Sequence, residues 1–127
     1  MEVEKGRKDT LKKLLFFALI DLILVLDNAL ANQNFINVFV SGEDGYDTYR
    51  IPALIKTKAG TLLAFCEGRK ISVSDSGNID LVLKRSVDNG QTWSPMNVVW
   101  DDGENTCGNP CVVQDERTGE ILLLMTW

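Results

Sequence analysis

The 127-residue sequence contains no histidine, so its chemistry rests on other side chains. This excludes histidine-based catalytic triads, H-E-x-x-H zinc sites and zinc fingers. The three cysteines, Cys66, Cys107 and Cys111, form no zinc-binding C-x-x-C pairs. Cys66 lies in an apolar run and is predicted to pack as a small buried hydrophobe. Cys107 and Cys111 flank a turn, and would form a disulfide only if that turn brought them close together.

One short window has the residue types of a structural turn. Ser86-Val87-Asp88-Asn89-Gly90-Gln91-Thr92-Trp93 fits the pattern S-x-D-x-G-x-x-W, which is called an Asp-box. The aspartate can accept backbone hydrogen bonds, the glycine permits a positive φ, and the tryptophan can pack beneath a hairpin. The alternative interpretation is a generic Asx-turn, which requires the aspartate but not the serine, glycine and tryptophan around it. The four fixed residues, Ser86, Asp88, Gly90 and Trp93, therefore predict a structural role without catalysis.

The composition is that of a globular domain. Apolar residues make up 45% of the chain and charged residues 24%, with a formal net charge of -5. These values exclude a wholly disordered or collagen-like chain. Binding to nucleic acid requires clustered lysine and arginine, so the acidic balance and the lack of a basic tract argue against that partner.

Short apolar runs separated by polar turns predict an all-β domain from Asn34 onward, since no segment there has a helical period. The expected strands are Phe35–Val40, Ile51–Ile55, Thr61–Cys66, Ile79–Arg85, Asn97–Trp100, Cys111–Val113 and Glu120–Thr126. Three pairs of these runs flank turn signals, which indicates hairpins.

Two hairpins resemble each other. Pro52-Ala53-Leu54-Ile55 is echoed by Pro110-Cys111-Val112-Val113, with the two prolines 58 positions apart. A repeat near 50 residues, built of antiparallel strands, is typical of a propeller blade, although a β-sandwich also contains regular hairpins. A propeller needs at least four blades, and the last residues form a buried-type strand. We therefore expect the chain to be the front part of a longer protein.

The first 31 residues differ from the rest. A basic cluster precedes the apolar run Leu14–Leu26, and Ala29-Leu30-Ala31 follows it. This order is typical of a secretory signal peptide, and the run is shorter than the roughly 20 residues that span a bilayer as a helix. We expect residues 1–31 to be a signal helix and residues 32–127 the domain. The alternatives are an uncleaved membrane anchor and a helix packed on the domain.

The order of motifs resembles the sialidase (neuraminidase) family. Tyr49-Arg50-Ile51-Pro52 contains the R-I-P motif, Glu67-Gly68-Arg69 follows the next strand, and the Asp-box comes after both. The likeness covers about Val38 to Trp127 and is greatest to secreted bacterial-type enzymes. It implies the first one to two blades of a six-bladed β-propeller.

The resemblance also implies roles for site residues. Arg50 matches the first of three arginines that hold the carboxylate of sialic acid, and a planar guanidinium suits that ligand because it forms two parallel charge-assisted bonds. Arg69 resembles a neighbouring pocket arginine, with Glu67 placed to orient it, and Asp75 falls where the acid/base aspartate lies. Asn109 is similar to a residue that binds a sugar hydroxyl, and Asp80 has a supporting role.

Each of these residues also has an ordinary structural interpretation. Arg69 would form a surface ion pair, Asp75 would be a solvated loop aspartate, and Asn109 would be a turn-former before proline. From the residues alone the solvated interpretation of Asp75 prevails, and the resemblance reverses it.

The family implies an exported, retaining exo-α-sialidase that releases terminal sialic acid from glycoproteins, glycolipids or oligosaccharides. Its nucleophile is a tyrosine activated by a glutamate, and it uses neither metal nor organic cofactor. Tyr46 and Tyr49 precede the R-I-P motif and do not match that nucleophile. The fragment alone is therefore expected to be inactive. The alternatives are a non-catalytic Asp-box propeller that binds sialylated glycans, and a fragment that does not fold alone.

Overall fold

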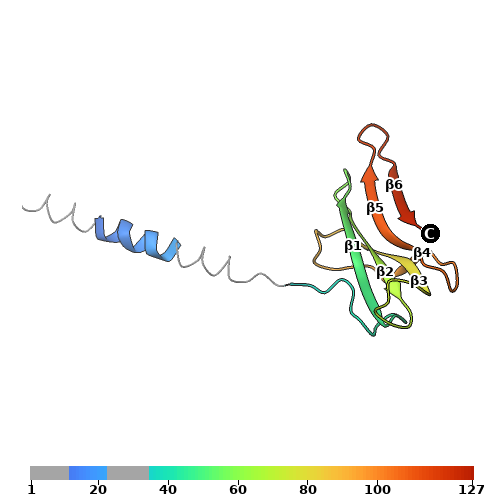
Figure 1. Cartoon of the computed structure of the whole chain (residues 1–127). Coiled ribbons are helices and arrows are strands. Elements are labelled where there is room, and N and C mark those ends of the chain that lie inside the picture. The colour runs from blue at the N-terminus through green and yellow to red at the C-terminus, as the bar shows by residue number, and fades with distance from the viewer. Residues whose placement is uncertain (1–11, 23–34) are drawn as a thin grey trace, which may run out of the picture. The chain divides into compact units, whose positions relative to one another are not determined.

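The computed structural model describes residues 12–22 and 35–127, and the chain divides into the units Met1–Phe35 and Ile36–Trp127. Residues 12–22 form a helix, drawn in blue in Figure 1. Its leucine and phenylalanine side chains are largely exposed. Within these described ranges, no helix has the length and apolarity needed to cross a membrane. The Ala29-Leu30-Ala31 segment and the expected boundary after residue 31 lie outside the described residues.

Two antiparallel sheets make up the second unit (Figure 1). Four strands follow one another in the order β1-β2-β3-β4, and two more, β5 and β6, pair as a hairpin. Their bounds are β1 Thr48–Lys56, β2 Leu62–Arg69, β3 Ile79–Ser86, β4 Asn97–Trp100, β5 Gly108–Gln114 and β6 Ile121–Thr126. The prediction of antiparallel hairpins from short apolar runs is confirmed.

The two faces of the four-stranded sheet have different roles. On β2, residues alternate between faces, and each shares a face with its partner on β3. One face carries Cys66 and Val82, which are buried in a cluster with Tyr46. The other carries Leu63 and Phe65 and, toward the end of β2, the charged residues of the candidate site.

The repeat seen in the sequence extends to a shared backbone irregularity. The register of β1 shifts between Arg50 and Ala53, and that of β5 between Gly108 and Cys111. Ile51 (φ 54°) and Asn109 (φ 49°), each just before a proline, adopt the left-handed conformation that is uncommon outside glycine. The two bulges therefore occur at equivalent positions of the repeat.

The Asp-box forms the turn between β3 and β4. Asp88 accepts hydrogen bonds from the backbone N–H of Thr92 (2.9 Å), the Thr92 hydroxyl (2.6 Å) and the Ser86 hydroxyl (2.8 Å). Gly90 has φ 91°, and the Trp93 indole donates to its carbonyl over 3.2 Å. The hydrogen bonds to Thr92 and Ser86 lower the pKa of Asp88 to about 2.

The expected strand Phe35–Val40 is wrong. Phe35 is 92% exposed, and the backbone beyond it enters a turn in which Glu43 N–H donates to the Val40 carbonyl. Of this run, Phe39 packs against the Tyr46 cluster. This apolar run thus contributes one anchoring side chain rather than a strand, because no neighbouring strand pairs with its backbone N–H and C=O groups.

The cysteines are unpaired. Cys66 is buried, as the apolar run predicts, and its burial raises its pKa to about 11. Cys107 is buried while Cys111 is exposed, so the turn between them does not join them in a disulfide.

Candidate active site

A cavity of about 240 Å³ lies beside the two bulges. It is lined by Arg50, Ile51, Glu67, Arg69, Asp75, Thr106 and Asn109. Five of these seven are residues singled out in the sequence. Ile51 was seen there only as part of the R-I-P motif, and no sequence signal pointed to Thr106. Thr106 binds the loop between β2 and β3, because its hydroxyl donates to the carbonyl of Gly77 over 3.2 Å.

The bulge in β1 directs Arg50 into this cavity. Arg50 is the register partner of Glu67 on β2, so the two residues share a face of the sheet. Its own carbonyl accepts a hydrogen bond from Cys66 Sγ over 3.0 Å. The Arg50 side chain remains 45% exposed, so a ligand can reach its guanidinium.

The loop between β2 and β3 brings Asp75 onto both arginines. Asp75 Oδ1 lies 2.9 Å from Arg50 Nη1 and 2.9 Å from Arg69 Nη2. The Val73 carbonyl also accepts from Arg69 Nη1 over 2.6 Å. The side chain of Asp75 is nevertheless 79% exposed, so this contact holds a carboxylate at the surface between two cations.

Arg69 is buried and held by a second carboxylate. Glu67 Oε2 accepts hydrogen bonds from Arg69 Nε (3.1 Å) and Nη2 (2.6 Å), and both side chains are 3% exposed. Burial alone would lower the pKa of Arg69, but its hydrogen bonds to Glu67 and Asp75 outweigh that effect and raise it. The guanidinium therefore stays charged and keeps a fixed orientation.

Asn109 reaches the cavity from the second sheet. Its backbone N–H donates to Glu67 Oε1 over 2.9 Å, and its side-chain amide donates to the Thr126 hydroxyl over 3.0 Å. Its left-handed conformation results from the bulge in β5. The residue therefore does more than form a turn before proline, because its main chain contacts the buried acid of the first sheet.

Asp80 lies on the opposite face of the sheet. It is the register partner of Gly68, so it points away from Glu67 and Arg69. The Tyr46 hydroxyl donates to its Oδ2 over 2.5 Å, and Lys70 Nζ lies 3.0 Å from the same oxygen. Burial, and then this hydrogen bond, raise the pKa of Tyr46. Asp80 thus supports the sheet without lining the cavity.

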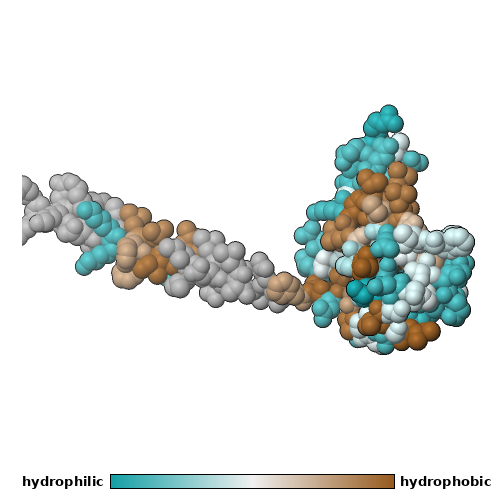
Figure 2. All heavy atoms as spheres, in the orientation of Figure 1, coloured by the Kyte–Doolittle hydropathy of each residue, from teal (hydrophilic) through white to brown (hydrophobic). Residues whose placement is uncertain are grey.

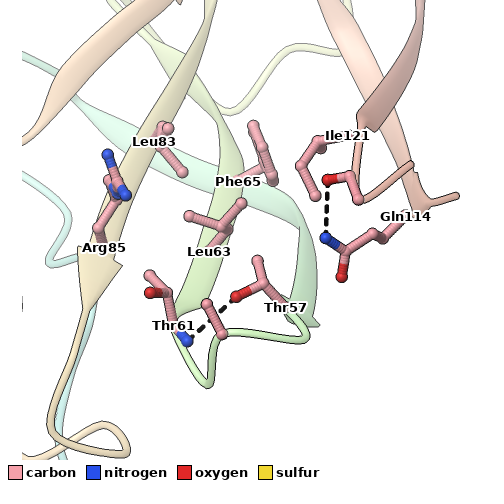
Figure 3. Close-up of a pocket in the computed structure, with 10 residues that line it drawn as sticks. Thr57, Thr61, Leu63, Phe65, Leu83, Arg85, Gln114 and Ile121 are labelled. Atoms are coloured by element: carbon pink, nitrogen blue, oxygen red, sulfur yellow. Dashed lines mark hydrogen bonds between the residues drawn. The ribbon is translucent and has the colours of Figure 1, made fainter. Parts of the chain in front are cut away.

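A larger cavity of about 480 Å³ lies at the far end of the same face (Figure 3). Leu63, Phe65 and Leu83 of the first sheet face Ile121 of the second across it, and the Gln114 side chain donates to the Gly119 carbonyl. Arg85 is the charged residue in its lining, which contains no carboxylate. This cavity is a gap between the apolar faces of two sheets, and it lacks groups for acid/base chemistry.

The smaller cavity combines one fixed guanidinium group, that of Arg69, with the accessible side chains of Arg50 and Asp75. Such a site can bind a carboxylate and offer a proton donor or acceptor beside it. Among the residues that the structure describes, no group of three or more cysteine, aspartate or glutamate side chains is arranged to hold a metal ion. The fold and site define an antiparallel β domain with a polar cavity lined by two arginines and two carboxylates.

Comparison with known proteins identifies the family. An exo-alpha-sialidase of Aspergillus fumigatus is 41% identical over 90 residues, which are 65% of this chain and 22% of that protein. A sialidase of Bacteroides fragilis is 31% identical over 119 residues, or 87% of this chain and 22% of that protein. The solved Hadza microbial sialidase Hz136 matches with a TM-score of 0.60 and 37% identity, over 65% of this chain and 18% of that chain. No protein-family model matches the chain.

The chain belongs to the sialidase family. It spans about a fifth of the length of the curated relatives that it matches. The resemblance inferred from the R-I-P motif, the Glu67-Gly68-Arg69 segment and the Asp-box is therefore confirmed at the level of the family.

Proposed function

We propose that this chain contributes one wall of the active site of an exo-α-sialidase, a retaining glycosidase that releases terminal sialic acid from glycoconjugates. The observation that carries the proposal is the contact of Asp75 with both Arg50 and Arg69 in one cavity. A module that only binds sialylated glycans would need the arginines, but it would not need an acid at that position.

In the proposed mechanism Arg50 binds the carboxylate of sialic acid. Its guanidinium is exposed enough to be reached and can form two parallel hydrogen bonds with that group. Arg69, fixed by Glu67, faces the same cavity and adds a second positive charge. Asn109 lines the same cavity and is proposed to contact a sugar hydroxyl through its side-chain amide.

Asp75 is the proposed general acid and base. It sits on a loop and is exposed, so it can leave the arginines and approach the glycosidic oxygen. After it leaves the arginines the carboxylate takes up a proton from solvent and donates it to the leaving oxygen. As the base it later takes a proton from the water molecule whose oxygen attacks the anomeric carbon and displaces the nucleophile. Family resemblance assigns the tyrosine nucleophile, its glutamate partner and two further arginines to regions outside the aligned residues.

The propeller and the export of the protein are further parts of this proposal. Exposed apolar residues on the outer strands, such as Val98, Trp100, Leu122 and Leu124, suit contact with neighbouring blades of a six-bladed propeller. Figure 2 shows apolar areas among hydrophilic ones on the visible face of the domain. Residues 1–31 are proposed to act as an export signal, which would place the enzyme outside the cytoplasm.

Release of free sialic acid from sialyllactose, whose leaving group must be protonated, tests the proposed activity. The protein expressed from the complete reading frame that contains this chain is expected to release free sialic acid, and Asp75→Ala is expected to abolish the release. Asp115→Ala is the matched control, because Asp115 accepts hydrogen bonds in the turn between β5 and β6, remote from the cavity. An inactive wild-type protein, or an Asp75→Ala variant as active as the control, would refute the proposal.

A further inference from the structure

Glu67 is almost completely buried and contacts both sheets. Its Oε2 accepts two hydrogen bonds from the Arg69 guanidinium, and its Oε1 accepts one from the backbone N–H of Asn109. A buried carboxylate is costly unless its oxygens are paired, and here three N–H donors satisfy them. One side chain on β2 therefore links a pocket arginine to the main chain of β5.

The space around Glu67 depends on Gly108. A β-carbon at position 108 would overlap Glu67 Oε1 and would lie 3.1 Å from its Cδ. Seven other glycines of the described residues have a positive φ, but Gly108 does not. Its backbone conformation would accept other residues, so the reason for glycine here is room for the carboxylate.

The bulge in β5 completes this arrangement. The register shift between Gly108 and Cys111 frees the Asn109 N–H from pairing with β6 and turns it toward Glu67. A carboxylate that accepts from a backbone N–H makes a strong, charge-assisted bond. The contact thus links the main chain of the second sheet to the carboxylate that holds Arg69.

We propose that Glu67 is the positioning residue that joins the two sheets at the pocket, by holding the Arg69 guanidinium with one oxygen and the Asn109 main chain with the other. The inference rests on the proposed function, since it takes Arg69 and Asn109 to line the substrate site. It also assigns Gly108 a role, which is to leave the space that the Glu67 carboxylate fills.

Two substitutions test separate parts of this arrangement. In Glu67→Gln, the side-chain amide oxygen can still accept a hydrogen bond from the Asn109 N–H. The amide NH₂ then faces the N–H donors of Arg69, and two donors cannot form a hydrogen bond with each other. We expect kcat/KM for a sialoside to fall by about 10- to 100-fold, the effect of losing a hydrogen bond between charged groups. Gly108→Ala keeps every charge and displaces the carboxylate, so a loss of the same order is expected.

Asp80→Asn is the matched control. Asp80 is likewise a buried acid at the end of the same strand pair, but it lies on the opposite face with Tyr46 and Lys70. It is expected to lower thermal stability without changing kcat/KM per folded molecule. Comparison with this variant separates a loss of positioning from a loss of folded protein.

A double substitution identifies the group through which Gly108 acts. In a Glu67→Ala background no carboxylate occupies the space beside Gly108. Adding Gly108→Ala to that variant is therefore expected to leave its kcat/KM unchanged. Equal losses of Gly108→Ala in both backgrounds would overturn the proposal. So would a Glu67→Gln variant with the kcat/KM of Asp80→Asn.

A spectroscopic readout keeps this test apart from that of the proposed function. In wild-type protein the Arg69 Nε–H and the Asn109 amide are expected to exchange slowly with solvent in NMR spectra. Glu67→Gln should speed exchange at Arg69 and spare Asn109, whereas Gly108→Ala should speed both. If the wild-type protein cleaves no sialoside the proposed activity fails, and unchanged Arg69 exchange in Glu67→Gln would then overturn the positioning role as well.

Discussion

Arg50 Nη1 lies 2.9 Å from Asp75 Oδ1, although 25 positions separate the two residues. Arg50 is 45% exposed and Asp75 79% exposed, so solvent screens this ion pair. Exposed pairs of this kind contribute about 0–1 kcal/mol. The contact is therefore weak enough for a ligand carboxylate to replace Asp75 on Arg50, which would leave Asp75 with only its contact to Arg69, 2.9 Å away.

The competition between Asp75 and the ligand gives the first prediction. Asp75→Asn removes the charge that competes for Arg50, so free N-acetylneuraminic acid should bind about two- to fivefold more tightly, the worth of an exposed ion pair. Calorimetry or NMR titration measures the dissociation constant, with Asp115→Asn as control. Weaker binding by Asp75→Asn would show that Asp75 attracts the ligand rather than competing with it.

Substitution of the proposed carboxylate-binding arginine gives the second prediction. Arg50→Lys keeps the charge but loses the planar pair of donors, so KM for a sialoside should rise by about 10- to 100-fold. The control is Arg85→Lys, which makes the same change in an exposed residue of β3 that lines the larger cavity. Equal KM values for the two variants would contradict binding at Arg50.

The Asp-box gives a prediction about pH and stability. The pKa of Asp88 is about 2 in the folded chain, against an ordinary value of 3.8, so the unfolded chain binds the proton first as pH falls. The stability that Asp88 contributes is present above about pH 4 and is lost as the pH falls toward 2. Thermal unfolding at several pH values should show this loss in the wild-type protein.

Thr92→Val is the informative variant for this effect. It removes the hydroxyl that donates to Asp88 Oδ2 but keeps the carboxylate itself. The stability difference between wild type and variant should be constant above pH 5 and should shrink between pH 4 and pH 2. A difference that does not change over that range would contradict the role assigned to the carboxylate.

The strands and the Asp-box turn were predictable because they depend on local patterns. Each hairpin has its own apolar runs and turn residues, and the Asp-box sets its four side chains within one window. Phe35–Val40 has the same apolar character, yet it forms no strand. A run of this kind needs a neighbouring strand to pair with, and the sequence does not show whether one is available.

The site was predictable in its residues but not in its contacts. Motif spacing pointed to Arg50, Arg69, Asp75 and Asn109, and all four line one cavity. The second contact of Glu67 depends on a bulge 42 positions away, and the sequence offers no signal for it. The separation of Asp80 from the cavity depends on the register of β2 with β3, which apolar patterning does not determine.

The proposed export signal makes its own prediction. The protein recovered from the culture medium or periplasm should begin near Asn32, as determined by N-terminal sequencing. Leu19→Arg introduces a charge into the apolar run, so it should reduce export, whereas Lys58→Gln in the β1–β2 turn should not. Exported protein that retains Met1 would refute cleavage.

The proposed protonation of the leaving oxygen by Asp75 is tested most directly by the dependence of the rate on the leaving group. The measurement is kcat/KM of wild type and of Asp75→Asn on two substrates. One is a 4-methylumbelliferyl sialoside, whose leaving group needs little protonation. The other is sialyllactose, whose leaving group must be protonated. We expect kcat/KM of Asp75→Asn to fall by about 10²- to 10⁴-fold on sialyllactose, the usual contribution of general acid catalysis, and much less on the aryl sialoside. Equal losses on the two substrates would contradict the proposed protonation.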